Sequence, residues 1–367
     1  MKIKMKLLGL GTLTAAALLP LQVHASPSLA GGVWFNYGYD DREVKDNEDL
    51  GDIGGEALIL YADHQVEDKP WSVSAEFRMG PGSFTDPANN STGDQTVLHK
   101  GWIGYQFDEQ SSLKIGKSQV PFGWKTVNFW PGDHLLGGYA DQMDVGFKYS
   151  RTGDGVSYDF AYYHADDWGA TSTDTVDDNG HWGSSATYRK VQTVVGNVDW
   201  HLSDATTLGL SVQSGGLQDL TGGTANQEIS GDHQAFNLHY YGDFGNVYTK
   251  AQFLSTERTD LPAAGTQADP LALTESETTR AALLVGYKAN DWNYYLEVVQ
   301  AEETNTKVDA TAYVPGARYS YGPGWIYLEY LSQDGYIGRD GEVIDTDPND
   351  GSKYTFDAFY ASIDYYF

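Results

Sequence analysis

The sequence predicts an all-β chain that forms a transmembrane antiparallel β-barrel of 16 strands. Three observations predict it: side-chain polarity alternates with period two to the end of the chain, short turns alternate with longer polar loops, and the last strand ends on an aromatic residue. Alternation places apolar side chains on one face of a strand and polar ones on the other. In a barrel that crosses a bilayer, the apolar face contacts lipid and the polar face lines the lumen.

The first 25 residues have the composition of a secretory signal peptide. Three lysines lie among the first six residues, residues 7–19 form an uncharged apolar run, and Val23-His24-Ala25 offers small residues at the two positions that a signal peptidase reads. The apolar run is shorter than the roughly 20 residues that a spanning helix needs. We therefore expect residues 1–25 to be removed on export and residues 26–367 to form one outer-membrane barrel domain.

The composition excludes several classes of protein. The chain has 367 residues, a formal net charge of −28, 26 Tyr and no Cys, so no disulfide can form. Disordered chains lack so many aromatic residues, and nucleic acid binds to basic faces, so we expect no nucleic-acid partner. The nine His residues are scattered, and no nucleophile, base and orienting residue share the lipid-facing parity. We expect no catalytic residues, no cofactor and no metal site.

Individual strands can be followed by their alternation. Residues 71–79 alternate large apolar side chains with Ser, Glu and Arg, and residues 143–150, 156–162, 207–213 and 292–298 behave in the same way. Segments of this length, about 9 to 12 residues, suit tilted strands that cross a bilayer. The polar parity then assigns the following charged residues to the lumen wall: Arg78, Lys100, Lys114, Lys148, Lys250, Arg280 and Lys288 as bases, and Glu76, Asp144, Asp159, Glu297, Glu329 and Asp364 as acids.

The turn signals give the strand count. Short turns alternate with longer polar loops, which gives 16 strands with both termini on the short-turn side. Outer-membrane barrels have this arrangement, with short periplasmic turns and long outer loops. The segments 53–61, 188–201 and 309–320 have the weakest alternation, so counts of 14 or 18 stay open. The predicted short turns are residues 67–70, 108–111, 151–155, 203–205, 242–245, 289–291 and 321–324.

The last strand is a separate membrane signal. Phe359, Ala361, Ile363, Tyr365 and Phe367 share one face, and Phe367 ends the chain. This looks like the terminal strand that the barrel-assembly machinery of Gram-negative bacteria recognises, so we expect that machinery as a partner, with outer-membrane lipid and lipopolysaccharide around the barrel. Aromatic residues at strand ends are expected at the membrane interfaces: Tyr39, Trp71, Tyr105, Tyr149, Trp292 and Tyr366.

A resemblance to a known family is found after the fifth predicted strand. Lys114-Ile-Gly-Lys-Ser-Gln-Val-Pro-Phe-Gly123 resembles the IGQ–PFG passage of the phosphate-selective porin O and P family, and residues 98–105 and 144–148 are similar to it as well. The resemblance is densest over residues 97–148. It implies a 16-stranded homotrimer in the outer membrane of a Gram-negative bacterium. It also implies a third loop folded into the pore and the passage of anions, with phosphate as substrate, over lysines and arginines.

The basic wall residues support this implication in part. A 16-stranded barrel leaves an aqueous channel, and like-signed charges in a narrow lumen attract counter-ions. We therefore interpret one group of cations as the pore-lining constriction, although pairing of these cations with Glu76 and Asp144 across the wall is an open alternative. The constriction candidates are Arg78, Lys100, Lys114, Lys117, Lys125 and Lys148.

The same region is rich in aromatic residues. Trp102, Trp124, Phe129 and Trp130 are candidates for a stacking track for sugars, or they pack the loop against the wall. The sequence therefore predicts a porin for passive diffusion of small hydrophilic solutes with a preference for anions. A porin for sugars or other uncharged solutes is the alternative, and an outer-membrane enzyme or an adhesin barrel is less well supported.

Overall fold

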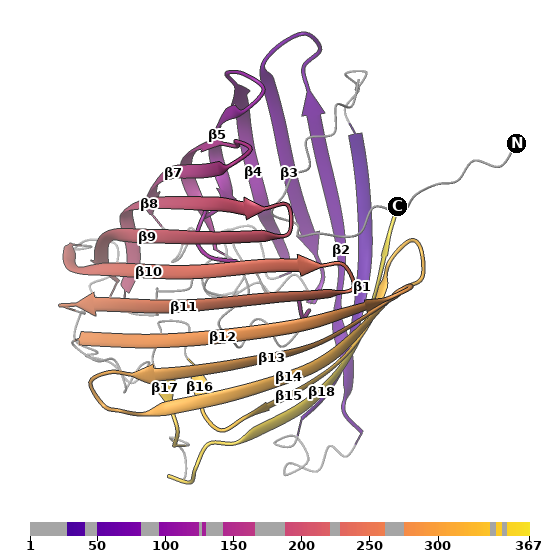
Figure 1. Cartoon of the computed structure of the whole chain (residues 1–367), viewed down its shortest axis with the longest axis vertical. Helices are drawn as coiled ribbons and strands as arrows, with labels where there is room; N and C mark the ends of the chain where they lie inside the picture. Colours follow the sequence, from indigo (N-terminus) through magenta and orange to yellow (C-terminus); the bar gives the residue numbers. More distant parts are fainter. Residues whose placement is uncertain are drawn as a thin grey trace, which may run out of the picture.

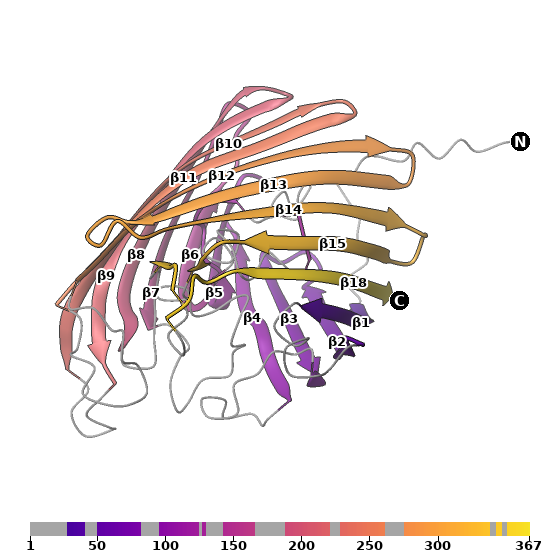
Figure 2. The same cartoon turned by 90° about the horizontal axis from the view of Figure 1, so that it is seen from below.

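The computed structural model describes residues 28–40, 50–81, 95–124, 127–129, 142–165, 188–220, 228–260, 275–337, 343–346 and 351–367. Sixteen antiparallel strands close into one barrel (Figure 1, and from below in Figure 2). This confirms the predicted fold class and the count of 16 strands. In the described part of the chain, no helix is long and apolar enough to cross a membrane. The proposed signal peptide, residues 1–25, lies outside the described residues.

The strands follow one another around the barrel in sequence order, and β1 pairs with β18 to close the ring. The short strands β16 (Tyr336–Ile337) and β17 (Val343–Ile344) form a separate two-stranded sheet in the last long connection. The barrel strands are β1 (Ser28–Asp40), β2 (Asp52–Gln65), β3 (Trp71–Met79), β4 (Thr96–Gln106), β5 (Ser111–Gln119), β6 (Met143–Arg151), β7 (Val156–Ala165), β8 (Tyr188–Ser203), β9 (Thr206–Asp219), β10 (Ile229–Phe244), β11 (Val247–Thr259), β12 (Glu275–Ala289), β13 (Trp292–Glu303), β14 (Asp309–Ser320), β15 (Trp325–Gln333) and β18 (Phe356–Tyr366).

The outer face of the barrel is apolar on every strand. On β3, Trp71 and Val73 are exposed, whereas Ser74 and Glu76 on the opposite face are buried. A soluble protein does not expose a continuous apolar surface of this extent. Because the ring of strands has no edge, each strand pairs with a neighbour on both sides, with a few bulges such as the one between Glu76 and Phe77. A closed ring of this kind is what a lipid environment requires of strands.

The short connections lie where the sequence predicts them, with one shift. The turn near 242–245 is Gly245-Asn246, because β10 continues through Phe244. Gly245 has a φ of +78°, a backbone conformation that residues with a side chain rarely adopt. In the turn after β4, the carboxylate of Asp108 accepts hydrogen bonds from Gln110 N (2.8 Å) and the Ser111 hydroxyl (3.1 Å). These bonds lower the pKa of Asp108 below its usual value.

One of the expected interfacial aromatics faces the lumen instead. Tyr366 lies opposite Gly32 in the register of β18 and β1, and its ring packs edge-on against Trp325 (centroids 5.8 Å apart). Its neighbour Tyr365 is 46% exposed and faces outward. The expectation for Tyr366 is wrong because Tyr366 shares the inward parity of Asp364 on β18, although it lies at the end of the strand.

The apolar core lies inside the barrel. Phe122 and Trp124, which follow β5, are buried together with inward side chains of the strands from β7 onward. Val343 of β17 belongs to the same cluster. One wall of the lumen is therefore covered by chain segments that fold inward. Several inward side chains of this wall are apolar: Val195, Leu254, Leu284, Val299, Val314 and Leu331.

Candidate pore constriction

The segment after β5 turns into the barrel. Val120 N donates to Gln142 O (2.8 Å), so the two ends of the third loop are tied together just before β6. Gly123 follows with a φ of +64°, and a Cβ at this position would lie 2.9 Å from Gln252 Oε1. Gly123 N donates to the hydroxyl of Ser211 on β9 (3.0 Å). The lack of a side chain therefore lets the loop backbone lie directly against the opposite wall.

The rest of the described loop continues along that wall. Trp124 Nε1 donates to Ala251 O on β11 (3.0 Å). Asn128 Nδ2 donates to Glu297 Oε2 on β13 (2.6 Å), and Phe129 N donates to Glu329 Oε1 on β15 (2.7 Å). The loop therefore contacts β9, β11, β13 and β15 in turn, which confirms the expectation that it folds into the pore.

The aromatic candidates of the loop are packed against the wall. Trp124 is 7% exposed, and the ammonium of Lys250 lies 5.0 Å from its ring centroid. Phe129 stacks on Tyr327 (5.0 Å) and meets Trp34 edge-on (5.8 Å). These contacts cover the ring faces that a sugar would need. Trp130 lies outside the described residues.

Three of the predicted lysines lie on the neighbouring strands β4, β5 and β6. Lys100 is on β4, and Lys114 on β5 is the register partner of Lys148 on β6. Lys100 lies over the ring of Tyr61 (5.9 Å) and Lys114 over that of Trp102 (4.5 Å), while Lys148 Nζ donates to Gln119 O (2.7 Å). Among the described residues, no carboxylate forms an ion pair with any of the three. Glu76, the register partner of Lys100, is paired with Arg78, and Asp144 lies close to Lys190.

Among the constriction candidates, Arg78 is the one that pairs with a carboxylate of the wall, which was the alternative to a role in the constriction. Its guanidinium lies 2.9 Å from Glu76 Oε1 on the same strand, and it also lies over the ring of Trp34 (5.3 Å). Asp144 is 4.0 Å from the ammonium of Lys190 on β8. Arg78 is thus a neutralised part of the lumen wall.

The other two lysine candidates, Lys117 near the end of β5 and Lys125 in the third loop, differ from the group of three. Lys117 is 3% exposed, and its register partners are Gly101 and Val145, of which Val145 is 45% exposed on the outer face. Gly116 before it has a φ of +125°, so the strand leaves regular alternation at this point. Lys117 does not share the row of Lys114 and Lys148. Lys125 lies outside the described residues.

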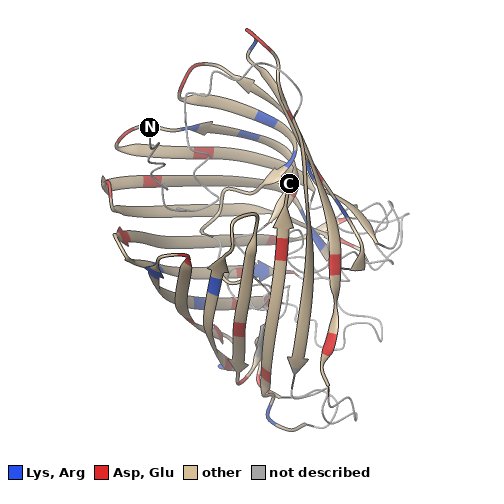
Figure 3. Cartoon of the chain, turned by 90° about the vertical axis from the view of Figure 1, so that its right-hand side faces the viewer, with Lys and Arg blue, Asp and Glu red and all other residues tan. Residues whose placement is uncertain are grey.

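Sequence reasoning missed several lumen charges. Lys190 is 1% exposed because Gln192, with a φ of +51°, interrupts the alternation of β8 and turns Lys190 to the inner face. Arg258 and Arg318 have the inward parity of β11 and β14 and could have been found by extending those strands. Figure 3 shows basic and acidic positions along the strands.

Burial separates the inward cations into two groups. Arg258 and Arg280 are 1% exposed, and Lys250 is 5% exposed, on the strands that the third loop contacts or adjoins. Lys100 and Lys114 are only half-buried. A solute in the lumen therefore meets the cations of β4 and β5 more readily than those of β11 and β12.

Comparison with solved structures supports the fold. The anion-selective porin of Comamonas acidovorans is 12% identical, with a TM-score of 0.60 over 94% of this chain and 100% of that one. OmpF of Salmonella typhi in complex with daunomycin is 13% identical (TM-score 0.61; 94% and 98% covered). OmpT of Vibrio cholerae is 14% identical (TM-score 0.59; 95% and 99% covered). At these identities the likeness shows the fold. No protein-family model and no curated protein matches the chain.

Proposed function

We propose that the chain is a porin of the Gram-negative outer membrane through which small hydrophilic solutes diffuse passively, with a preference for anions such as phosphate. The observation that carries the anion preference is the pair Lys100 and Lys114. Both cations are half-buried on the lumen side, both rest on aromatic rings, and neither has a carboxylate partner among the described residues. Tyr61, on which Lys100 rests, packs against the same wall cluster as Phe129 of the third loop.

The charge balance of the lumen supports this preference despite the net charge of −28. The carboxylates of Glu297 and Glu329 accept hydrogen bonds from the third loop, and Glu76 is paired with Arg78. Two unit charges about 4 Å apart interact by roughly 4 kcal/mol at intermediate dielectric but about 1 kcal/mol in water. Cations at a narrowing should therefore act more strongly on a passing ion than outer-loop acids, which salt screens beyond about 8 Å.

An uncharged solute such as a sugar is less well supported. Recognition of a sugar ring calls for an accessible aromatic face, and the faces of Trp124, Phe129 and Trp102 are occupied by Lys250, Tyr327 and Lys114 respectively. An enzymatic barrel has little support as well. Ser157 Oγ lies 2.9 Å from His201 Nε2, but the other ring nitrogen of His201 meets the hydroxyl of Thr207 (3.2 Å), where a hydrolase would have a carboxylate.

Planar-bilayer recording tests the proposal. The wild-type protein should form open channels, and its zero-current potential across a potassium chloride gradient should have the sign of an anion-preferring pore. The double variant Lys100→Glu with Lys114→Glu should reduce or reverse that potential. Lys69→Glu, in the exposed turn between β2 and β3, makes the same change of charge away from the lumen wall and should leave the potential unchanged. A protein without conductance would contradict the porin assignment, and a cation-preferring wild type would contradict the anion preference alone.

A further inference from the structure

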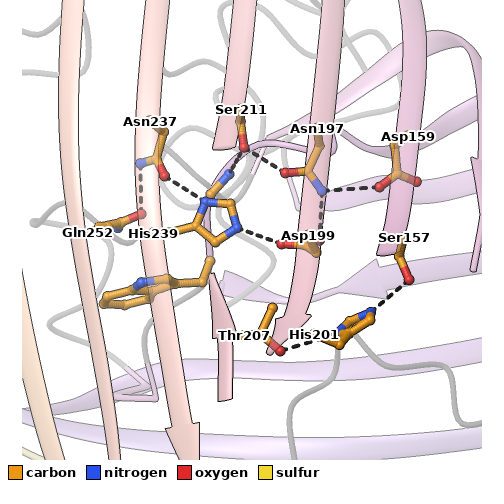
Figure 4. Close-up of polar contacts among 12 residues, drawn as sticks. Ser157, Asp159, Asn197, Asp199, His201, Thr207, Ser211, Asn237, His239 and Gln252 are labelled. Atoms are coloured by element: carbon orange, nitrogen blue, oxygen red, sulfur yellow. Dashed lines mark hydrogen bonds and ion pairs between the residues drawn. The ribbon is translucent and has the colours of Figure 1, made fainter. Parts of the chain in front are cut away.

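Two rows of polar side chains cross the inner wall from β7 to β10 (Figure 4). In the first row, Asp159, Asn197, Ser211 and Asn237 are successive register partners. The second row lies one step closer to the short turns and consists of Ser157, Asp199, Gly209 and His239. Gly123 of the third loop reaches the wall at Ser211, a member of the first row.

Gly209 is a gap in the second row. A Cβ at this position would overlap both His239 Nε2 and Asp199 Oδ1. Because Gly209 has no side chain, His239 on β10 reaches across β9, and its Nε2 lies 2.9 Å from Asp199 Oδ1 on β8. Any other residue at position 209 would separate this pair.

The pair determines how the amides of the first row are oriented. Asn197 Nδ2 donates to Asp199 Oδ2 (2.9 Å), so the amide oxygen of Asn197 points toward Ser211. His239 Nδ1 lies 3.0 Å from Asn237 Oδ1, and Asn237 Nδ2 donates to Gln252 Oε1 (2.9 Å). Each amide is therefore held by a residue of the second row, and the side on which it donates is fixed.

Ser211 joins this network to the third loop. Its hydroxyl donates to Asn197 Oδ1 (2.8 Å), which leaves a lone pair of the oxygen to accept from Gly123 N (3.0 Å). If Asn197 were turned over, its NH2 group would occupy one of the two lone pairs of this oxygen and the Ser211 hydroxyl would lose its acceptor, so the hydroxyl would have to reorient beneath Gly123. The position of the Gly123 backbone against β9 thus depends on side chains of the two adjacent strands, β8 and β10.

We propose that Asp199 and His239, joined across Gly209, are positioning residues for the third loop. They hold the amides and the hydroxyl on which Gly123 rests, and in this way they fix the width of the constriction. The inference rests on the proposed function, because a constriction matters only in a barrel that conducts.

Single-channel recording of Gly209→Ala, with Gly196→Ala as matched control, tests the proposal. Gly196 is on β8, and an added Cβ there would meet Val212 Cγ2 at an ordinary 3.6 Å. Loss of one neutral hydrogen bond changes an equilibrium by about fivefold. The Gly209→Ala channel should therefore spend about five times longer than the wild type in open states of higher conductance, in which the third loop has left the wall. The Gly196→Ala channel should have the dwell times and conductance of the wild type.

Ser211 provides a second comparison that does not disturb the ring of His239. Ser211→Ala removes the acceptor for Gly123 N and should reproduce the larger open states. Ser211→Thr keeps a hydroxyl and should restore wild-type current, which a role in packing alone would not predict. If Gly209→Ala fails to fold, the comparison of Ser211→Ala with Ser211→Thr tests the inference instead. A wild-type protein that does not conduct would overturn the proposed function. If the wild type conducts but Gly209→Ala and Ser211→Ala give the same single-channel currents as Gly196→Ala, only this inference is overturned.

Discussion

Lys114 and Lys148 lie directly opposite each other on β5 and β6, and both belong to the lumen side of the wall. Like charges at opposed positions of neighbouring strands destabilise a sheet. Neither lysine has a carboxylate partner among the described residues, and their polar contacts are with the ring of Trp102 and the carbonyl of Gln119. A mobile anion between them would offset their repulsion, so this pair is the place where we expect an anion to dwell.

The first prediction concerns block by phosphate. In a wild-type channel that carries chloride, added phosphate should reduce the current and the effect should saturate, because a multivalent anion gains from both lysines. Lys114→Gln should raise the phosphate concentration for half-block by at least about fivefold, the effect of one charge at about 4 Å in water. Lys114→Arg keeps the charge and should behave like the wild type, and Lys69→Gln is the control. Phosphate that leaves the wild-type current unchanged would restrict the preference to small anions in general.

The second prediction concerns the contact between Phe129 of the third loop and Glu329 on β15. Glu329 Oε1 accepts hydrogen bonds from Phe129 N (2.7 Å) and the Tyr295 hydroxyl (2.5 Å). Glu329→Ala removes this acceptor and should raise the open-channel conductance, since a bond to a charged group is worth about 1.5–3 kcal/mol. Glu329→Gln retains an acceptor oxygen and should keep the conductance close to that of the wild type. Equal conductance in both variants and the wild type would show that this anchor does not hold the loop.

The alternation of the sequence was sufficient to predict the barrel. On β3 and β6 the apolar parity is the exposed one, and Lys100 and Lys114 face the lumen as their strands predict. The strand count follows from the turns because a two-residue connection such as Gly245-Asn246 requires residues that tolerate positive φ. These features are local, so they can be recognised without knowledge of the rest of the chain.

The parts that could not be predicted depend on contacts between distant segments. Leu284 and Val299 face inward although they are apolar, because the lumen wall on this side packs against inward-folded segments that contribute Phe122 and Val343. Unbroken apolar pairs such as Leu283-Leu284 and Val298-Val299 are the only trace of this in the sequence. The contact between His239 and Asp199 could not be predicted from the sequence either. The two residues are on β10 and β8, and they meet only because β9 places a glycine, Gly209, between them.

The third prediction concerns assembly. The resemblance of residues 97–148 to the phosphate-selective porin family implies a homotrimer. Closed cyclic oligomers bury one patch of each protomer against the next, and every barrel strand here exposes large apolar side chains on the outer wall. Light scattering in mild detergent should give the mass of three chains, and short cross-linkers should give dimers and trimers but no larger species. A monomeric mass at all detergent concentrations tested would contradict this assembly without affecting the barrel.

The last prediction uses the depth profile of one strand. The outward residues of β12 change from Glu277 and Thr279 at the loop end through Leu283 to Tyr287 near the next short turn. Leu283 is 51% exposed, and its register partners are Ala251 and Val298. This places Leu283 in the apolar band and Thr279 near the outer interface.

A lysine should therefore have very different costs at these two positions. At the bilayer midplane a lipid-facing Lys lowers the free energy of unfolding by about 2–4 kcal/mol, and close to an interface by about 0–1 kcal/mol, because there the ammonium reaches water. We expect Leu283→Lys to show the larger loss and Thr279→Lys a loss near zero in reversible urea unfolding from lipid vesicles. The two variants add the same charge to the same face of the same strand, so the difference between them measures depth alone. Equal losses at both positions would contradict the assignment of this face to the hydrocarbon core of a bilayer.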